Sequence, residues 1–203
     1  MRKKTPHPTI EPQRWEGKDA LSTVHQLNKR SFALLAGLPH DDATLKSLWA
    51  QVDERVCERA GRCPVLLLDL HFQRRDWWQR ASQRSADPVP SENQHSPEIE
   101  RAASLLCEIL IDAWTIGRTM PRAVNLVFGV APPVLTMILQ MGPPELERIA
   151  AEEAQRLKAR WPESRSFWKG LLEAAIGTDD QALANVHLHC LQLLGSDLLP
   201  TLT

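Results

Sequence analysis

The sequence has no tyrosine, only nine glycines among 203 residues, and no long apolar run. None of the glycines forms the glycine-rich loop that cradles phosphates in nucleotide-binding folds. No apolar segment reaches the roughly 18–20 residues that a membrane-spanning helix needs. The first residues are basic and are followed by polar residues and prolines, a pattern unlike a secretory signal. These absences predict a soluble, cytoplasmic protein that does not enter a membrane.

Cysteine is also sparse, and its spacing is not that of a metal site. The four thiols stand at Cys57, Cys63, Cys107 and Cys190. Without a secretory signal, reduced thiols are expected. The most metal-like phrase is His187-Leu-His189-Cys190, but on a helix only His187 and Cys190 would share a face. Structural zinc normally takes four ligands, so we expect no metal and no cofactor here.

Catalytic patterns are equally scarce. There is no nucleophile elbow and no helical metalloprotease motif. Asp69 and His71 resemble an acid–base pair, but residues two apart on a helix do not face each other. A nucleophilic role for Cys63 would need a base that spacing alone does not supply. The sequence therefore predicts a protein that is not an enzyme.

What is present is a series of apolar residues at helical spacing, separated by glycine and proline. We expect an all-α protein, with helices over residues 17–36, 41 or 42 to 61, 97–117, 121–128, 132–140, 143–161, 167–176 and 178–195. Ser96 is expected to cap one helix, and Thr178 with Gln181 to cap another. The run 63–72 fits a buried strand or a helix; helix is favoured because no partner strand is evident. No internal repeat is recognised.

A polar stretch over residues 82–96, containing Pro88 and Pro90, has no apolar periodicity. It predicts a linker between two helical parts, residues 1–81 and 97–203. The first part has an excess of basic residues and the second an excess of acidic ones. We expect residues 97–203 to fold as a unit.

Two basic clusters are candidate contacts to DNA. The first is Arg74, Arg75 and Arg80, which flank the pair Trp77-Trp78. Basic residues beside aromatic ones grip phosphates and stack on bases, although the same pattern also describes core tryptophans beneath a solvated face. The second cluster is Arg156, Lys158 and Arg160.

Residues 123–139 can be laid onto a helix-turn-helix with Gly129 in the turn. The candidate recognition helix, residues 131–138, has no Arg, Lys, Asn or Gln to read a base edge. We therefore expect it to pack rather than to read DNA.

The number of apolar stripes suggests self-association. The candidate helices are one containing Leu105, Leu106, Ile109 and Leu110, and the last helix, with Leu191 and Leu194. A homo-oligomer is predicted.

Several phrases of residues 97–198 resemble FlhD, a family of flagellar transcription regulator subunits. They are residues 104–110 in the first helix, Val127-Phe-Gly-Val130, residues 142–150, and 179–187 with Asp179-Asp180 and His187. The resemblance implies a helical dimer that joins a second, FlhC-like subunit to bind promoter DNA and activate transcription. The cysteine behind a disulfide-linked dimer in many members has no counterpart in residues 155–160. The alternative is an interaction or accessory factor of a secretion or motility system that does not bind DNA.

Overall fold

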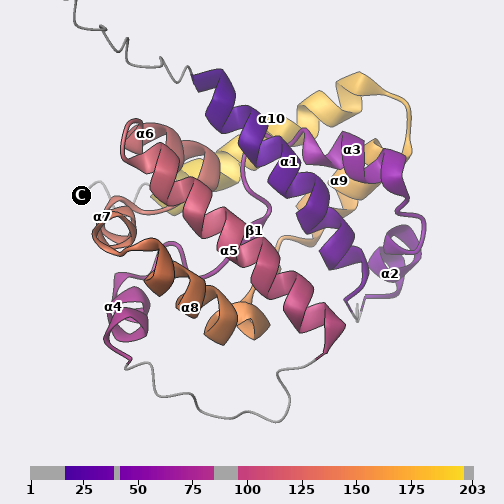
Figure 1. Cartoon of the computed structure of the whole chain (residues 1–203). Helices are drawn as coiled ribbons and strands as arrows, with labels where there is room; N and C mark the ends of the chain where they lie inside the picture. The colour runs from indigo at the N-terminus through magenta and orange to yellow at the C-terminus, as the bar shows by residue number, and fades with distance from the viewer. Residues whose placement is uncertain (1–16, 39–41, 85–95, 199–203) are drawn as a thin grey trace, which may run out of the picture.

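The computed structural model describes residues 17–38, 42–84 and 96–198 and shows an all-α protein (Figure 1). The first half contains α1 (Gly17–Ala36), α2 (Ala43–Trp49), α3 (Glu54–Gly61), β1 (Leu68–Asp69) and α4 (Arg75–Gln83). The second contains α5 (Pro97–Gly117), α6 (Pro121–Ala123), the π-helical turn η1 (Val124–Phe128), α7 (Pro132–Gln140), α8 (Pro143–Glu153), the 3-10 turn η2 (Ala154–Arg156), β2 (Lys158–Ala159), α9 (Arg165–Ile176) and α10 (Asp180–Leu198). Within the described residues, β1 and β2 are the only strands, and each has two residues.

Local capping explains most of the helix boundaries. The Ser96 side chain accepts a hydrogen bond from the Ile99 N–H at the start of α5, as the sequence predicts. Proline occupies the first turn of α5, α7 and α8, where its missing N–H has no cost. At the start of α10 the cap differs from the expectation: Asp179 Oδ1, rather than Thr178, accepts from the Gln181 N–H.

Two predicted helices are interrupted. The helix expected to run to residue 61 is split into α2 and α3, because Asp42 and Asp53 each cap a separate helix start. The helix expected over 143–161 ends at Glu153 and gives way to η2 and β2. The break between α2 and α3 is therefore set by a cap residue, Asp53, that lies within the apolar pattern.

The prediction of a helix over residues 63–72 is wrong. β1 pairs antiparallel with β2, with Leu68 opposite Ala159 and Asp69 opposite Lys158. The buried Asn28 side chain on α1 satisfies the backbone that leads into β1. Its Nδ2 donates to the Cys63 and Val65 carbonyls at 3.0 and 2.9 Å, and its Oδ1 accepts from the Leu67 N–H at 2.8 Å. These partners replace the hydrogen bonds that a helix would make internally.

Each of the two strands begins a copy of the same local motif. The expectation that the chain has no internal repeat is therefore wrong. Each strand leads into a tight turn that contains a non-glycine residue with positive φ, His71 at 52° and Trp161 at 50°. Each turn leads into a helix, α4 after β1 and α9 after β2. The first turn of each helix carries a pair of buried aromatic residues, Trp77-Trp78 in one and Phe167-Trp168 in the other.

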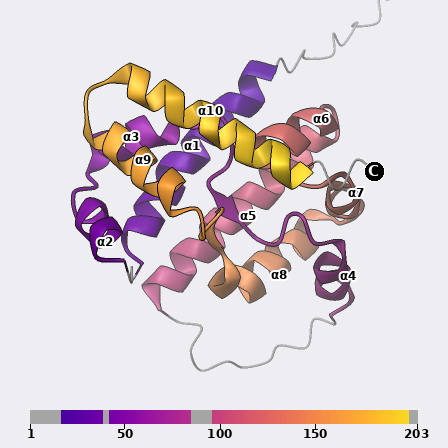
Figure 2. The same cartoon turned by 180° about the vertical axis from the view of Figure 1, so that it is seen from behind.

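The repeat extends to the helices that precede the motifs. α1 packs on α3, as α5 packs on α8, and α1 and α5 also pack on each other. The two motif helices are exchanged: α9 contacts α2 and α3 of the first half, whereas α4 contacts α7 and α8 of the second. Figure 1 shows the two resulting groups at opposite ends of the molecule, with α1 and α5 between them. α10 packs on α9 and lies across the outside (Figure 2).

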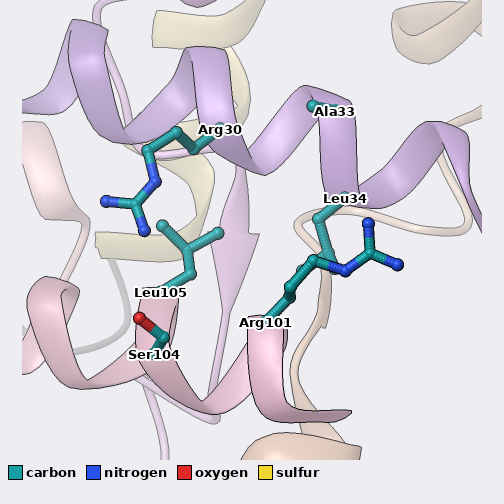
Figure 3. Close-up of a pocket in the computed structure, with 6 residues that line it drawn as sticks. All are labelled: Arg30, Ala33, Leu34, Arg101, Ser104 and Leu105. Carbon is teal, nitrogen blue, oxygen red and sulfur yellow. The ribbon is translucent and has the colours of Figure 1, made fainter. Parts of the chain in front are cut away.

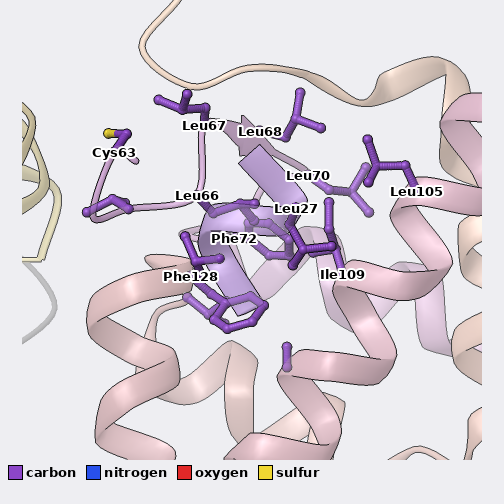
Figure 4. Close-up of a cluster of buried hydrophobic side chains, with 14 of the residues drawn as sticks. Leu27, Cys63, Leu66, Leu67, Leu68, Leu70, Phe72, Leu105, Ile109 and Phe128 are labelled. Atoms are coloured by element: carbon purple, nitrogen blue, oxygen red, sulfur yellow. The ribbon is translucent and has the colours of Figure 1, made fainter. Parts of the chain in front are cut away.

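The exchange produces a single core. Leu27 and Leu66 of the first half meet Ile109 and Phe128 of the second in one buried cluster (Figure 4). The boundaries 1–81 and 97–203 therefore do not separate two cores. Residues 82 and 83 of the predicted linker belong to α4, and residues 85–95 lie outside the described part of the chain.

Among the described helices, none by itself has the length and apolar character to cross a membrane; Pro121–Phe128 and Pro132–Gln140 meet that test only together, as a pair bent by 119°.

Candidate nucleic-acid interface

The β1–β2 pairing brings the two predicted basic clusters together. Lys158 lies opposite Asp69 in the register, and Arg74 follows the turn after β1. His71 stands between them. Burial lowers the pKa of His71, Asp69 opposes this effect, and the positive charges of Lys158, Arg74 and Arg156 lower the pKa further. Cations from both halves thus act on a single imidazole.

These three cationic side chains are open to solvent. The side chains of Arg74, Arg156 and Lys158 are 58%, 52% and 48% exposed. Arg74 pairs with Asp76 at 3.1 Å and Arg156 with Glu153 at 3.0 Å, whereas Lys158 and Asp69 are 4.0 Å apart. The pair of Arg74 with Asp76 is exposed on both sides and therefore weak, so Arg74 can exchange this carboxylate for phosphate. Arg156 keeps its contact with Glu153, which is buried, and exposes the rest of its guanidinium to solvent.

The same face continues along α4. Arg84 at the end of α4 pairs with Glu153, the carboxylate that also pairs with Arg156. Glu153 is 2% exposed, so its charge is covered by the two arginines. Together Arg74, Arg84, Arg156 and Lys158 form what we call the basic strip. It follows α4, whose nine residues span about 14 Å, enough to face several phosphates of a duplex.

Of the remaining predicted contacts, Arg75 and Arg80 are exposed on α4, and Arg80 pairs with Asp76 at 3.1 Å. The prediction that Arg160 contacts DNA is wrong. It is 3% exposed, and its Nη2 donates to the carbonyls of Phe128 and Gly129 at 3.0 and 3.2 Å. Its Nη1 occupies the space that a Cβ on Gly129 would fill. Arg160 therefore holds the turn before α7 and does not face a DNA backbone.

The aromatic residues between the basic ones belong to the core. Trp78 is fully buried and stacks on Phe72 with ring centroids 6.1 Å apart, while Trp77 is 7% exposed and packs on His71 at 5.0 Å. Neither indole has an open face for a base. Of the two interpretations open from the sequence, the structure favours core tryptophans beneath a basic surface.

The helix-turn-helix-like segment has suitable geometry but an unsuitable surface. The segments Pro121–Phe128 and Pro132–Gln140 are bent by 119° around Gly129, whose φ is 61°. Helix-turn-helix pairs cross at about 90–120°. α7 buries Val134, Leu135 and Ile138. Its exposed residues are Pro132, Pro133, Thr136 and Gln140. No arginine or lysine of α7 is available to read a guanine.

The self-association residues separate into two groups. Leu105, Leu106, Ile109, Leu110 and Leu194 are 0–4% exposed within the chain and are already used in its own core. The prediction that these five residues mediate self-association is wrong, because a second copy could not reach them. Leu191 is 46% exposed, and Leu188, which sequence reasoning missed, is 60% exposed. The helical spacing of Leu188 and Leu191 was a visible signal, but it did not reveal which face of α10 was outward.

A hollow of about 280 Å³ lies between α1 and α5, with Arg30, Ala33 and Leu34 on one side and Arg101, Ser104 and Leu105 on the other (Figure 3). Arg30 pairs with Glu108, and Arg101 lies 3.5 Å from Glu98. The hollow is thus lined by two exposed ion pairs and by apolar side chains.

Among the described residues, no group of three or more His, Cys, Asp or Glu side chains could hold a metal ion. Cys190 instead faces Cys63, with the two Sγ atoms 3.2 Å apart, and this hydrogen bond and burial raise the pKa of the Cys190 thiol. His187 is partly buried on α10; burial lowers its pKa, and the charge of His25 lowers it further.

No protein-family model matches this sequence, and neither a curated protein nor a solved structure matches it. The resemblance to FlhD, carried by the phrases of residues 97–198, therefore stays a prediction.

Proposed function

We propose that this chain is a DNA-associated transcription regulator subunit, of the kind that the FlhD resemblance implies, and that its basic strip contacts the phosphate backbone. One observation supports the proposal above the others: the cations of two sequence-distant clusters converge around His71. Side chains of one sign gathered on an open face are the electrostatic footprint of a polyanion partner.

The isolated chain binds weakly in this proposal. Its formal net charge is −1, so attraction comes from the basic strip alone and not from the molecule as a whole. The exposed face of α7 carries no arginine or lysine to distinguish base pairs. Sequence preference therefore comes from a partner subunit, and this chain supplies positioning contacts.

The test is duplex binding measured by fluorescence anisotropy over a range of salt concentrations. With four phosphate contacts, the slope of log K against log salt should be about −3 to −4. Arg156→Ala and Lys158→Ala should each reduce the slope by about 1 and weaken binding equally on all sequences. Arg165→Ala is the matched control, because Arg165 takes the place of Arg75 in the second motif and is 77% exposed.

Equal losses from Arg156→Ala and Arg165→Ala would show that binding follows overall charge and not the basic strip. Absence of binding, alone and with any co-encoded partner subunit, would contradict the proposal. The second candidate, an interaction factor that does not bind DNA, would then be favoured by the exposure of Leu188 and Leu191.

A further inference from the structure

Two buried cysteines from distant parts of the chain meet in the core. Cys63, in the segment that leads into β1, faces Cys190 of α10, and their Sγ atoms are 3.2 Å apart. Neither residue is exposed, and Cys63 belongs to the buried cluster drawn in Figure 4. We propose that Cys63 and Cys190 form a reversible disulfide when the protein meets hydrogen peroxide.

The position of Cys63 is fixed by the hydrogen bonds of its backbone. Its N–H donates to the Ala60 carbonyl at 3.1 Å, and its carbonyl accepts from Asn28 Nδ2 at 3.0 Å. Cys190 lies on the buried face of α10 with Leu183 and Leu194. The S–S bond of a disulfide is about 2.05 Å long, so the two sulfur atoms need to approach each other by only about 1 Å. The thiols are therefore already placed for bond formation before any oxidant arrives.

The surroundings assign an order to the two thiols. The hydrogen bond to Cys63 is the main cause that raises the pKa of the Cys190 thiol, so Cys190 keeps its proton and is the second thiol to react. The buried Arg160 guanidinium interacts with both sulfur atoms, and its Nη1 has no hydrogen-bond partner among the described residues. A positive charge beside a thiol favours the thiolate, which is the nucleophilic form.

The reaction consumes one hydrogen peroxide for each disulfide. The Cys63 thiolate attacks one peroxide oxygen, the O–O bond breaks, and Cys63 becomes a sulfenic acid, while the departing hydroxide takes up the proton that the Cys63 thiol released. The Cys190 sulfur then attacks the Cys63 sulfur, the S–O bond breaks, and the departing hydroxide takes the Cys190 proton. The two thiols lose two electrons in total, and the peroxide is reduced to two water molecules.

The disulfide joins α10 covalently to the first half of the chain. In the thiol form α10 packs on α9, and its Asp197 accepts a hydrogen bond from Trp161 Nε1 at 2.7 Å. The new bond links residues that are 127 positions apart, and a cross-link over so long a loop lowers the conformational entropy of the unfolded chain. The oxidised protein is therefore the more stable form. The inference does not rest on DNA binding, because neither cysteine belongs to the basic strip.

Peptide mapping tests the inference directly. The wild type is treated with hydrogen peroxide, its remaining thiols are alkylated, and it is digested with trypsin without reductant. Peptides 63–74 and 170–203 each contain one cysteine, so their linkage identifies the bond between Cys63 and Cys190. The linked peptides should appear after peroxide treatment and separate after addition of dithiothreitol. Without reductant, the urea midpoint of the oxidised protein should be about 1–2 M higher than that of the reduced protein.

The variants Cys63→Ala and Cys190→Ala should each lose this midpoint shift. Each variant is compared with its own reduced form, so the stability lost with the sulfur atom cancels. The matched control is Cys57→Ala, because Cys57 is also buried, at 6% exposed, and lies on the helix that ends just before Cys63. It should respond to peroxide as the wild type does. Peptides that stay unlinked, a disulfide that uses Cys57 or Cys107, or equal midpoint shifts in Cys63→Ala and Cys57→Ala would each overturn the inference.

Discussion

The two turn motifs share a backbone and differ in what covers them. In the second motif Trp161 is 7% exposed, and its Nε1 donates to Asp197 of α10 at 2.7 Å. In the first motif His71, at the equivalent position, is half-buried and surrounded by the charges of Arg74, Arg156 and Lys158. The same turn is thus sealed by an additional helix in one copy and left open beneath cations in the other.

The difference separates residues that serve the fold from residues that stay open to solvent. Both motifs contribute aromatic residues to one core, so the shared backbone serves the fold. Arg160 also serves the fold: it lies in the sealed motif and donates hydrogen bonds to the carbonyls of Phe128 and Gly129. Exposed cations occur in both motifs: Arg74 lies in the open motif, whereas Lys158 and Arg165 lie in the sealed one.

The largest expected effect concerns the equivalent tryptophans, Trp78 and Trp168. Replacing either with alanine should lower the free energy of unfolding by about 3–5 kcal/mol, because both anchor the shared core. Urea unfolding followed by far-UV circular dichroism should give one transition in each variant. Two separated transitions, with only one affected by each substitution, would contradict the exchanged arrangement and restore two independent halves.

A smaller effect distinguishes the sealed motif. Gly129→Ala should destabilise the protein by about 3 kcal/mol, since alanine disfavours the positive φ and would displace the hydrogen-bonded Arg160. Gly142→Ala is the control: a Cβ there meets only Pro144 at 3.6 Å, and φ is −91°. Urea midpoints compare the two. A mild effect at Gly129 would show that Arg160 is not held as described.

The smallest effect is a dependence on pH. Burial is the main cause that lowers the pKa of His25, His71 and His187. Unfolded histidine titrates near 6.5, so just below that value the unfolded chain binds more protons. The stability that these histidines contribute is therefore fully present above about pH 6.5 and is lost as the pH falls below that value. The urea midpoint should decrease on acidification below about pH 6.5, and His187→Gln should reduce the decrease. A midpoint that rises on acidification would contradict these shifts.

Much of the helical pattern could be predicted from caps and breakers such as Ser96, Gly37 and Pro132. The strand pairing could not, because β1 depends on Asn28 and on β2, both distant in sequence. The repeat was hidden because its copies share backbone and burial but few residue types. The burial of Arg160 could not be predicted either, because the carbonyls that hold its guanidinium lie about 30 residues earlier in the sequence.

The most direct test of the account follows the His71 imidazole by NMR while a short DNA duplex is added at low salt. If phosphate lies on the basic strip, the His71 signal should shift and its pKa should rise, because a nearby negative charge favours the protonated ring. The His187 signal, on α10, should not change, and added salt should reverse the shift at His71. Duplex binding that leaves His71 unchanged would contradict the assignment of the open motif as the DNA contact.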